Sequence, residues 1–447
     1  MKPSLRIARS ALDLKSFLQT TIKSSNYKLS PIKLSQQQEW NLTDGVLGHR
    51  SGGFFYISGL VDNISGKEQL VLYQPQGAFN GLVVCKQEKN VYVLLQARVE
   101  PGNSGIGQYG PTIQSTPANY LRFHGGKETP YFDFFFKYNP QVRPIANSMQ
   151  LDLGKRYFQK SKILSYVESG SLVETAENMI WVPLKLVSEV LHYDNFLNTD
   201  LRSMLGVFDW DLFLDFNTSA SHTSITHANH FSDNNLSGKN MGKLVPLSQL
   251  QSWELTDEGI VDKANTGVSA NIYQVVSTTR EVKTWVQPLL CTANRGAIAL
   301  LVRQVGDNFT SNHSKNLTTD RQLEFLISYR SEFGISGEKV LLPSQIVYPG
   351  ENHQHQTTLC QEGKVLYEVI QSEEGGRFYQ NENIYQIILV DSSFESGDEQ
   401  SWVSVDTLKE LLKTSNKVSI QLRCIASLVL ENINPHTFAE RLVTINT

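Results

Sequence analysis

The 447-residue sequence has few cysteines, no long apolar run and no excess of basic charge. Its four cysteines, Cys85, Cys291, Cys360 and Cys424, lie far apart, which argues against a disulfide scaffold and a Cys-based zinc site. No apolar stretch approaches the ~18 residues of a membrane-spanning helix. The net charge of −4 and the pI near 6.2 argue against a general nucleic-acid-binding protein. We expect a cytoplasmic protein with reduced thiols that binds neither membrane nor nucleic acid.

Several catalytic motifs are also missing. The sequence has no P-loop and no strand–GxGxxG–helix pattern, which weakens NTPase and Rossmann interpretations, and it lacks G-x-S-x-G and H-E-x-x-H. His353 and His355 form an isolated pair. His222, His227 and His230 lie in a polar segment without an ordered set of Cys or carboxylate partners. We therefore expect a polar loop in that segment, with metal binding as the weaker alternative.

The first 38 residues are basic, with seven Lys or Arg and a single acid, Asp13. This composition is compatible with an organelle transit peptide. Apolar residues nevertheless recur near helical spacing, which favours a structural amphipathic helix in an accessory segment, residues 1–39. The residues of this expected apolar face are Leu5, Ala8, Leu12 and Phe17, with Ala11 and Leu18.

The most informative feature is an internal repeat. Residues 40–44 (WNLTD) recur as 253–257 (WELTD), and residues 156–159 (RYFQ) recur as 377–380 (RFYQ). The two matches run in the same order through both halves of the chain and have nearly the same spacing. A period this long greatly exceeds a solenoid unit, so the pattern indicates a duplicated domain.

Each copy is predicted to be an α+β domain. Segments rich in β-branched and aromatic residues come first, as at 91–95 and 298–302, and predict strands. A helical segment with one apolar face ends each copy, near 184–191 and 405–412. Many strands followed by a late helix are typical of the α+β class. We place the domains at 40–215 (copy 1) and 241–447 (copy 2), with a polar linker at 216–240.

Three polar segments are candidates for a functional site. The first, residues 96–103, follows a predicted strand. There Glu100 could serve as a general acid or base if burial raised its pKa, and Arg98 could bind a phosphate or carboxylate. The alternative, which the spacing alone favours, is a structural Arg–Glu pair that closes a turn.

The second candidate, residues 110–126, is rich in neutral hydrogen-bonding side chains suited to a sugar or a base. Tyr120 offers a stacking face and a hydroxyl, and His124 is close in sequence. A loop with two prolines explains most of these residues equally well. The third candidate, residues 371–379, has adjacent carboxylates, a Gly pair and an arginine, which fit either an acid–base or phosphate site or a charged β-turn.

These segments resemble the NDP-hexose 2,3-dehydratase family of deoxysugar biosynthesis. In copy 1, residues 95–103 (LQARVEPGN) are similar to the family's Q-A-K/R-x-E-P-G-N, and 111–120 (PTIQSTPANY) to its P-T-V-Q-A-T-x-x-N-Y. In copy 2, residues 285–290 (WVQPLL) and 372–379 (SEEGGRFY) are similar to W-x-Q-P-L-L and S-E-E-G-G-R-F-Y. The resemblance covers nearly the whole chain from Trp40.

The resemblance implies a tandem pair of Nudix-like domains, a homodimer, and a carbon–oxygen lyase that needs no metal or redox cofactor. The implied substrate is a dTDP-4-keto-6-deoxyhexose that loses water across C2–C3. The C4 ketone acidifies the C3 hydrogen, so a base can form an enolate and an acid can assist departure of the C2 hydroxyl. The alternatives are a non-catalytic nucleotide-sugar-binding paralogue and, with less support, a Nudix-type hydrolase, whose run of metal-binding glutamates is absent.

The family pattern is kept unevenly. In copy 2, E-P-G has become Glu332-Phe333-Gly334; in copy 1, the Q-S-E-Q-G-x-W-F-Y segment has become residues 150–158 (QLDLGKRYF). We therefore expect the hexose to bind in copy 1, while the copy 2 turn either serves a second site or completes the first. The catalytic candidates are Glu100, Tyr120 and His124. The substrate-binding candidates are Gln96, Arg98, Asn103, Thr112, Gln114, Asn119, Glu373, Glu374, Arg377 and Tyr379.

Overall fold

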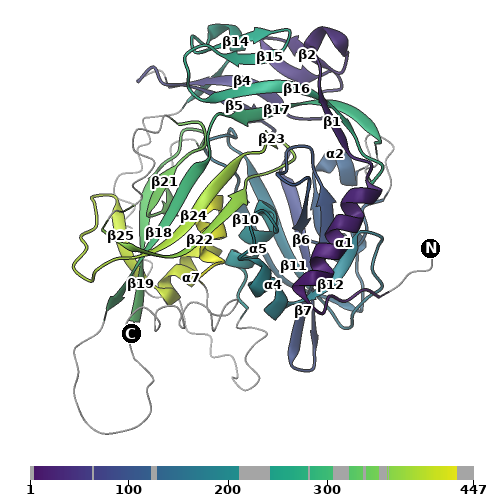
Figure 1. Ribbon diagram of the computed structural model, residues 1–447, viewed down its shortest axis with the longest axis vertical. Coiled ribbons are helices and arrows are strands. Elements are labelled where there is room, and N and C mark those ends of the chain that lie inside the picture. The colour runs from purple at the N-terminus through teal and green to yellow at the C-terminus, as the bar shows by residue number, and fades with distance from the viewer. Residues whose placement is uncertain are drawn as a thin grey trace.

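The computed structural model describes residues 5–62, 65–121, 128–210, 242–279, 282–305, 322–335, 339–351, 360 and 362–429. Strands dominate and helices are few, which agrees with the expected α+β class. Figure 1 shows two large sheets in the lower part of the molecule and two smaller sheets above them. Among the described residues, none of the helices is long and apolar enough to cross a membrane.

The first large sheet is built from copy 1. Its central strands β6 and β11 run parallel, whereas β10–β11, β6–β7 and β7–β12 are antiparallel. The strand β8 pairs with β7, and β9 pairs with β6. Across the sheet the order is β10 (Val142–Leu151), β11 (Ser161–Ser169), β6 (Ala78–Gln87), β7 (Asn90–Val99) and β12 (Met179–Pro183), with β8 (Gly107–Gly110) and β9 (Ile113–Ser115) alongside.

The second large sheet, from copy 2, has the same topology. Its parallel pair β18–β24 matches β6–β11. The outer antiparallel pairs even share a register break, at 144/146 in copy 1 and at the equivalent position, 365/367, in copy 2. The order is β22 (Lys364–Ser372), β24 (Glu382–Leu389), β18 (Gly296–Val305), β19 (Gln322–Ser331) and β25 (Gln400–Ser404), with β20 (Lys339–Pro343) on β19 and β21 (Gln345–Val347) on β18.

The two small sheets exchange a strand. The strand β1 precedes copy 1 but pairs with β16 of copy 2, and β13 lies at the start of copy 2 but pairs with β4 of copy 1. The short 3₁₀ helices η1 (Leu34–Gln36) and η2 (Leu247–Gln249), both LSQ, follow these strands. One sheet holds β2 (Trp40–Thr43), β3 (Val46–His49), β4 (Tyr56–Val61), β5 (Glu68–Tyr73) and β13 (Lys243–Val245). The other holds β1 (Lys28–Pro31), β14 (Trp253–Thr256), β15 (Gly259–Asp262), β16 (Val268–Val276), β17 (Thr284–Thr292) and β23 (Phe378–Tyr379).

Two equivalent helices, α5 (Thr199–Val207) and α8 (Ile420–Ala426), pack against each other at the junction of the copies. A Cβ atom at Gly206 would lie 2.0 Å from the carbonyl oxygen of Arg423, so the helices touch through backbone. Each helix begins at a capping side chain, Asn198 or Ser419, that accepts a hydrogen bond from a backbone amide. The remaining helices are α1 (Ala11–Ser24), α2 (Pro117–Tyr120), α3 (Asp133–Phe136), α4 (Leu184–Val190) and α7 (Val405–Lys413).

The expected N-terminal helix is present, and its apolar face was predicted correctly at Ala11, Phe17 and Leu18 but not elsewhere. The helix α1 begins at Ala11, after a Ser10 cap, so Leu5 and Ala8 lie outside it. Leu12 is 70% exposed. The cap fixes where the helix begins, and hence which positions face the sheet. The buried residues of α1 are Leu14, Leu18 and Thr21.

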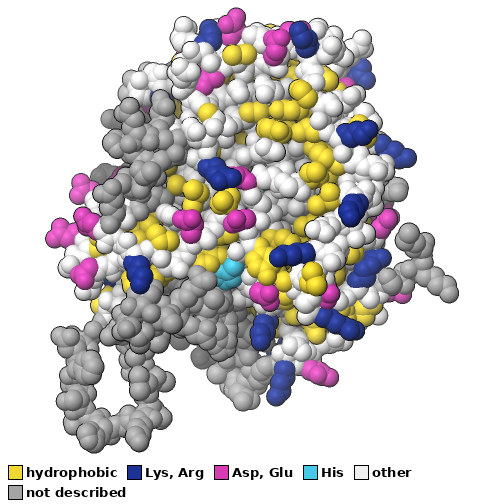
Figure 2. Space-filling model, viewed as in Figure 1, with side chains coloured by type: hydrophobic (Ala, Val, Ile, Leu, Met, Phe, Trp, Pro, Cys, Tyr) yellow, Lys and Arg dark blue, Asp and Glu magenta, His cyan; other side chains and the backbone are white. Residues whose placement is uncertain are grey.

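The surface agrees with the nearly balanced composition. Figure 2 shows both basic and acidic side chains spread over the face in view. The expected linker at 216–240, with its three histidines, lies outside the described residues, as does His124.

Candidate active site

The loop after β7 in copy 1 lies against the Gly-Gly turn of copy 2. The Gly102 amide donates to the Gly375 carbonyl (2.7 Å), and the Gln380 amide donates to the Gly102 carbonyl (2.7 Å). A Cβ atom at Gly102 would lie 1.6 Å from the Phe378 carbonyl oxygen, and one at Gly375 would lie 1.8 Å from Asn103 Oδ1. Only glycine permits such close approach. The first and third candidate segments therefore meet in one place, which we call the composite site.

The reciprocal junction has the same backbone pattern. The Gly334 amide of copy 2 donates to the Gly154 carbonyl of copy 1 (2.8 Å), and the Gln159 amide donates to the Gly334 carbonyl (2.8 Å). Each copy thus presents its β7- or β19-end loop to the turn of the other copy. The molecule has two such junctions, and their side chains differ.

At the composite site, β7 ends in a chain of polar contacts. Arg98 donates to Gln96 Oε1 (2.6 Å) and to Glu100 Oε1 (2.9 Å). The Arg98 and Glu100 side chains are only 10% and 4% exposed. The ion pair considered as the structural alternative is therefore present, and it is buried. Asn103 is also buried, and within the described residues neither of its amide atoms has a hydrogen-bond partner.

Gly110 leaves room for further polar groups beside Arg98. A Cβ atom there would lie 2.7 Å from Arg98 Cδ and 2.9 Å from Asn198 Nδ2. Asn198 Nδ2 donates to Gln114 Oε1 (2.8 Å), so β9 and the start of α5 meet at this point. Asn198 was not among the residues predicted from the sequence, where an Asn before a helical segment signals only a helix cap. We define the polar cluster as Gln96, Arg98, Glu100, Gln114 and Asn198.

The equivalent face of copy 2 is more apolar, although it keeps Ser328 and Arg330 at the positions of Gln96 and Arg98. Val340 and Leu342 are buried together with Leu151. Leu342 supplies a side chain where Gly110 has none, so the space is filled. Asn80 lies opposite Gln114 on β6 and is fully buried. Within the described structure its side-chain amide has no hydrogen-bond partner. Its counterpart in copy 2 is an isoleucine. The equivalent pairs are Asn80/Ile298, Gln108/Val340, Gly110/Leu342 and Gln114/Ile346.

Thr112 serves the sheet. Its hydroxyl donates to the Leu94 carbonyl (2.6 Å) and accepts from the Val83 amide (2.9 Å). In copy 2, Ser344 makes the same bridge, accepting from the Leu301 amide (2.8 Å) and donating to a β19 carbonyl. Because both copies have this hydroxyl bridge although their faces differ in polarity, we infer that the bridge supports the sheet.

Tyr120 lies at the end of α2 in an aromatic cluster. Its ring stacks on Phe132 (5.3 Å between centroids) and Phe136 (5.9 Å), and burial raises its pKa. The neighbouring Asn119 is exposed. Among the candidates of copy 2, Arg377 lies 4.4 Å over the Phe55 ring, while Tyr379 is beside Tyr273.

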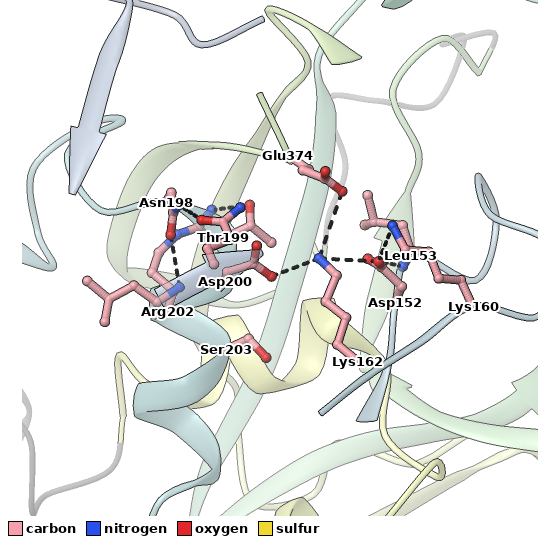
Figure 3. Close-up of polar contacts among 12 residues, drawn as sticks. Asp152, Leu153, Lys160, Lys162, Asn198, Thr199, Asp200, Arg202, Ser203 and Glu374 are labelled. Carbon is pink, nitrogen blue, oxygen red and sulfur yellow. Dashed lines mark hydrogen bonds and ion pairs between the residues drawn. The ribbon is translucent and has the colours of Figure 1, made fainter. Parts of the chain in front are cut away.

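A buried ion cluster lies next to the composite site and was not predicted. Lys162 Nζ is 2.7 Å from Asp200 Oδ1, 3.2 Å from Asp152 Oδ2 and 3.8 Å from Glu374 Oε2 (Figure 3). Lys160 Nζ is 3.2 Å from the same Asp152 oxygen. These side chains are at most 13% exposed. The only sequence signal was a pair of lysines, two residues apart, at the start of an apolar strand.

Opposite charges in this cluster keep Lys162 and Glu374 ionised, whereas burial raises the pKa of Asp200 and lowers that of Lys160. Desolvation raises the pKa of Glu374, but Lys160, Lys162 and Arg377 outweigh it and bring that pKa down to about 2. Desolvation disfavours the charged form of Lys162, yet the nearby carboxylates raise its pKa above the usual range. The Tyr157 hydroxyl donates to Glu374 Oε2 (2.7 Å). Glu374 is therefore a fixed anion at neutral pH.

Copy 2 has a neutral version of the same arrangement. Glu373, the counterpart of Asp152, accepts from Asn381 Nδ2 (2.6 Å) and Asn383 Nδ2 (3.2 Å), which replace Lys160 and Lys162. Burial raises the pKa of Glu373, and Arg156 opposes the rise. No group of three or more His, Cys, Asp or Glu in the part of the chain that the structure describes is placed to hold a metal ion.

Comparison with known proteins assigns the family. The NDP-hexose 2,3-dehydratase family model matches residues 11–208, 227–313 and 318–429. A dTDP-4-dehydro-6-deoxy-alpha-D-glucopyranose 2,3-dehydratase of Saccharopolyspora spinosa is 26% identical, covering 92% of this chain and 89% of that protein. Proteins of the same name from Amycolatopsis orientalis (25% identical; 93% and 89% covered) and Streptomyces violaceoruber (26%; 90% and 93%) also match.

Among solved structures, a Nudix hydrolase from M. smegmatis, RenU, aligns with 29% of this chain and 83% of its own. The sequence identity is 14% and the TM-score is 0.18, too low to define the fold. The family model, in contrast, extends over both copies and over both segments of the composite site. This chain belongs to the NDP-hexose 2,3-dehydratase family.

Proposed function

We propose that the protein is a carbon–oxygen lyase of deoxysugar biosynthesis that removes water across C2–C3 of a dTDP-4-keto-6-deoxyhexose. Family membership and the relatives' names support this activity. The observation that carries it to a site is the contact between Gly102 and Gly375. It joins the two segments that keep the family pattern, and it does so beside a buried polar cluster.

The reaction needs a base at the C3 hydrogen, an acid at the C2 hydroxyl and donors to the C4 oxygen. Glu100 is our candidate base, because its carboxylate is buried at the end of β7. Tyr120 and His124 are candidates for the acid and for donation to the C4 oxygen. Removal of the C3 proton gives an enolate, the C2 hydroxyl leaves as water, and the resulting enol becomes a 3,4-diketone. A positioned acid or base contributes roughly 10²–10⁴-fold.

Binding of the substrate divides between the copies. We assign the hexose to Gln96, Asn103 and Gln114 of copy 1, which offer amide donors and acceptors in a buried setting. Arg98 and Arg377 supply the positive charge that a diphosphate requires. Glu373 and Glu374 are both fully engaged with neighbouring groups. We therefore assign them to shaping the turn that carries Arg377 and Tyr379.

We further propose that copy 1 (40–215) and copy 2 (241–447) are Nudix-like domains derived from one ancestor, with 1–39 as an accessory segment. The matched order of the large sheets supports the duplication. A homodimer and a cytoplasmic location are proposals that rest on the family resemblance.

Incubation with dTDP-4-keto-6-deoxyglucose tests the activity directly. Loss of one water from the substrate, followed by mass spectrometry, is the expected result. Binding without turnover would support a nucleotide-sugar-binding paralogue instead. Mg²⁺-dependent release of dTMP would support a Nudix-type hydrolase.

A further inference from the structure

The ion cluster contacts the start of helix α5 and the Gly-Gly turn of copy 2, which both border the composite site. None of the proposed chemical steps uses this cluster. We propose that Lys162 is a positioning residue that ties helix α5 of copy 1 to the Gly-Gly turn of copy 2. This inference rests on the proposed function, because it concerns the geometry in which the substrate reacts.

The first tie runs from Lys162 to the start of α5. Lys162 Nζ lies 2.7 Å from Asp200 Oδ1, and Asp200 is the second residue of the helix. Asn198 caps this helix through the Leu201 amide (2.9 Å) and donates to Gln114 (2.8 Å). A displacement of Asp200 is therefore passed on to an amide of the polar cluster.

The second tie runs from Lys162 to the turn of copy 2. Lys162 Nζ lies 3.8 Å from Glu374 Oε2, and Tyr157 binds the same oxygen. The residue after Glu374 is Gly375, whose carbonyl accepts the Gly102 amide. One buried ammonium thus holds both the helix start and the turn that meet at the composite site.

The reciprocal junction lacks this link. At the positions of Lys162, Asp200 and Glu374 it has Asn383, Gln421 and Leu153, and its Glu373 is held by neutral amides. The face beside it has apolar side chains at the positions of Gln108, Gly110 and Gln114. The charged link therefore occurs at the junction that keeps a polar cluster, which is where precise placement of reacting groups matters.

The test must separate positioning from simple stabilisation. Lys162→Met leaves Asp200 and Glu374 without this ammonium partner, which is strongly destabilising for buried carboxylates. The double variant Lys162→Met/Asp200→Asn removes one of these charges together with the lysine. We expect it to recover most of the Tm that the single variant loses, while kcat for dTDP-4-keto-6-deoxyglucose stays roughly 10–100-fold below wild type. KM is expected to change less than kcat.

A second readout does not depend on turnover. In hydrogen exchange, the backbone amides of residues 372–380 should exchange faster in the double variant than in the wild type, because Lys162 no longer holds Glu374 of the turn. The matched control is Lys413→Met, which breaks a half-buried pair with Asp209 (2.8 Å) and should leave kcat and this exchange unchanged. If the double variant does not fold, Asp200→Ala removes the first tie and leaves two lysines facing two carboxylates.

The outcomes are distinguishable. Recovery of both Tm and kcat, with normal exchange at 372–380, would show that Lys162 is only structural. A wild-type protein that does not dehydrate the substrate would refute the proposed function, whereas the exchange experiment would still decide the role of Lys162.

Discussion

At the scale of single residues, the two junctions act as an internal control for each other. Each places a glutamate at the end of a strand against a Gly-containing turn, but Glu100 accepts a hydrogen bond from Arg98, whereas within the described residues neither carboxylate oxygen of Glu332 has a hydrogen-bond partner. Where the copies differ, as at Gly110 and Leu342, we propose that the copy 1 residue serves the chemistry, whereas the Thr112 and Ser344 bridges, which both copies have, serve the fold.

Gly110→Leu copies into copy 1 the residue that copy 2 has at the equivalent position. A side chain there collides with Arg98 and Asn198, so we expect kcat/KM to fall by at least about 10²-fold through displacement of the polar cluster. Gly77→Ala is the control, because its nearest neighbour is 3.6 Å away. Steady-state kinetics with circular dichroism measures both effects. Retained activity would place the hexose elsewhere.

Glu100→Gln and Glu332→Gln compare the two glutamates. We expect the first to lower turnover by at least about 10²-fold, the scale of a lost acid or base, with the fold kept. The second should do little to turnover. Equal losses in single-turnover assays, or a loss confined to Glu332→Gln, would show that the pocket has been assigned to the wrong copy.

Glu332 also predicts a pH dependence of stability. Burial raises its pKa to about 7, while Arg330 and Lys155 oppose the rise and Glu373 adds to it. Between about pH 4.5 and 7 the folded state keeps a proton that the unfolded state has lost. The free energy of unfolding therefore falls as pH rises through this interval, by up to roughly 3 kcal/mol. Glu332→Gln should remove this component. Urea titrations at about pH 5 and pH 8 measure the free energy of unfolding of the wild type and of Glu332→Gln. An equal loss of stability between these two pH values in both proteins would contradict the prediction.

At the scale of elements, the exchanged strands hold the copies together. Because β1 pairs with β16, removal of residues 1–31 should expose an edge of copy 2 that is distant in the sequence. We expect a lower Tm and faster amide exchange in β16 than in β4 of the truncated chain. Leu12→Ser, at an exposed position of α1, is a control for changes in the same segment. Unchanged exchange in β16 would refute the prediction.

The sequence predicted many elements but not how they combine. Strands near 91–95 and 298–302, and late helices near 184 and 405, are present because alternating and periodic apolar residues determine local structure. The strand exchange was not predictable, because the partner of β1 is set by tertiary contacts rather than by its own four residues.

The candidate site was predictable only in part. Lys160 and Lys162 gave only a weak signal, since a lysine in a strand is ordinarily solvent-exposed and nothing in their own segment predicts that Asp200 and Glu374 lie beside them. The sequence also left open whether the copy 2 turn serves its own site or completes the first, because a contact between distant loops leaves no local pattern.

At the scale of the whole molecule, each junction is assembled from the front of one copy and the back of the other. The two junctions are not independent, because Tyr157 and Asp152 of the copy 1 turn also contact Glu374 and Lys162 beside the composite site. The segments that depart from the family pattern, Glu332–Gly334 and residues 150–158, belong to different domains and lie far apart in the sequence. In space they face each other across a single junction, where Gly334 meets Gly154.

We propose that the paired departures have one history. After the proposed duplication, selection had to keep only the composite site, so the two segments of the other junction lost the family pattern together. Both copies are still required, since each supplies one segment of the composite site and their small sheets share strands. On this view the protein keeps two copies of an ancestral unit for the sake of one.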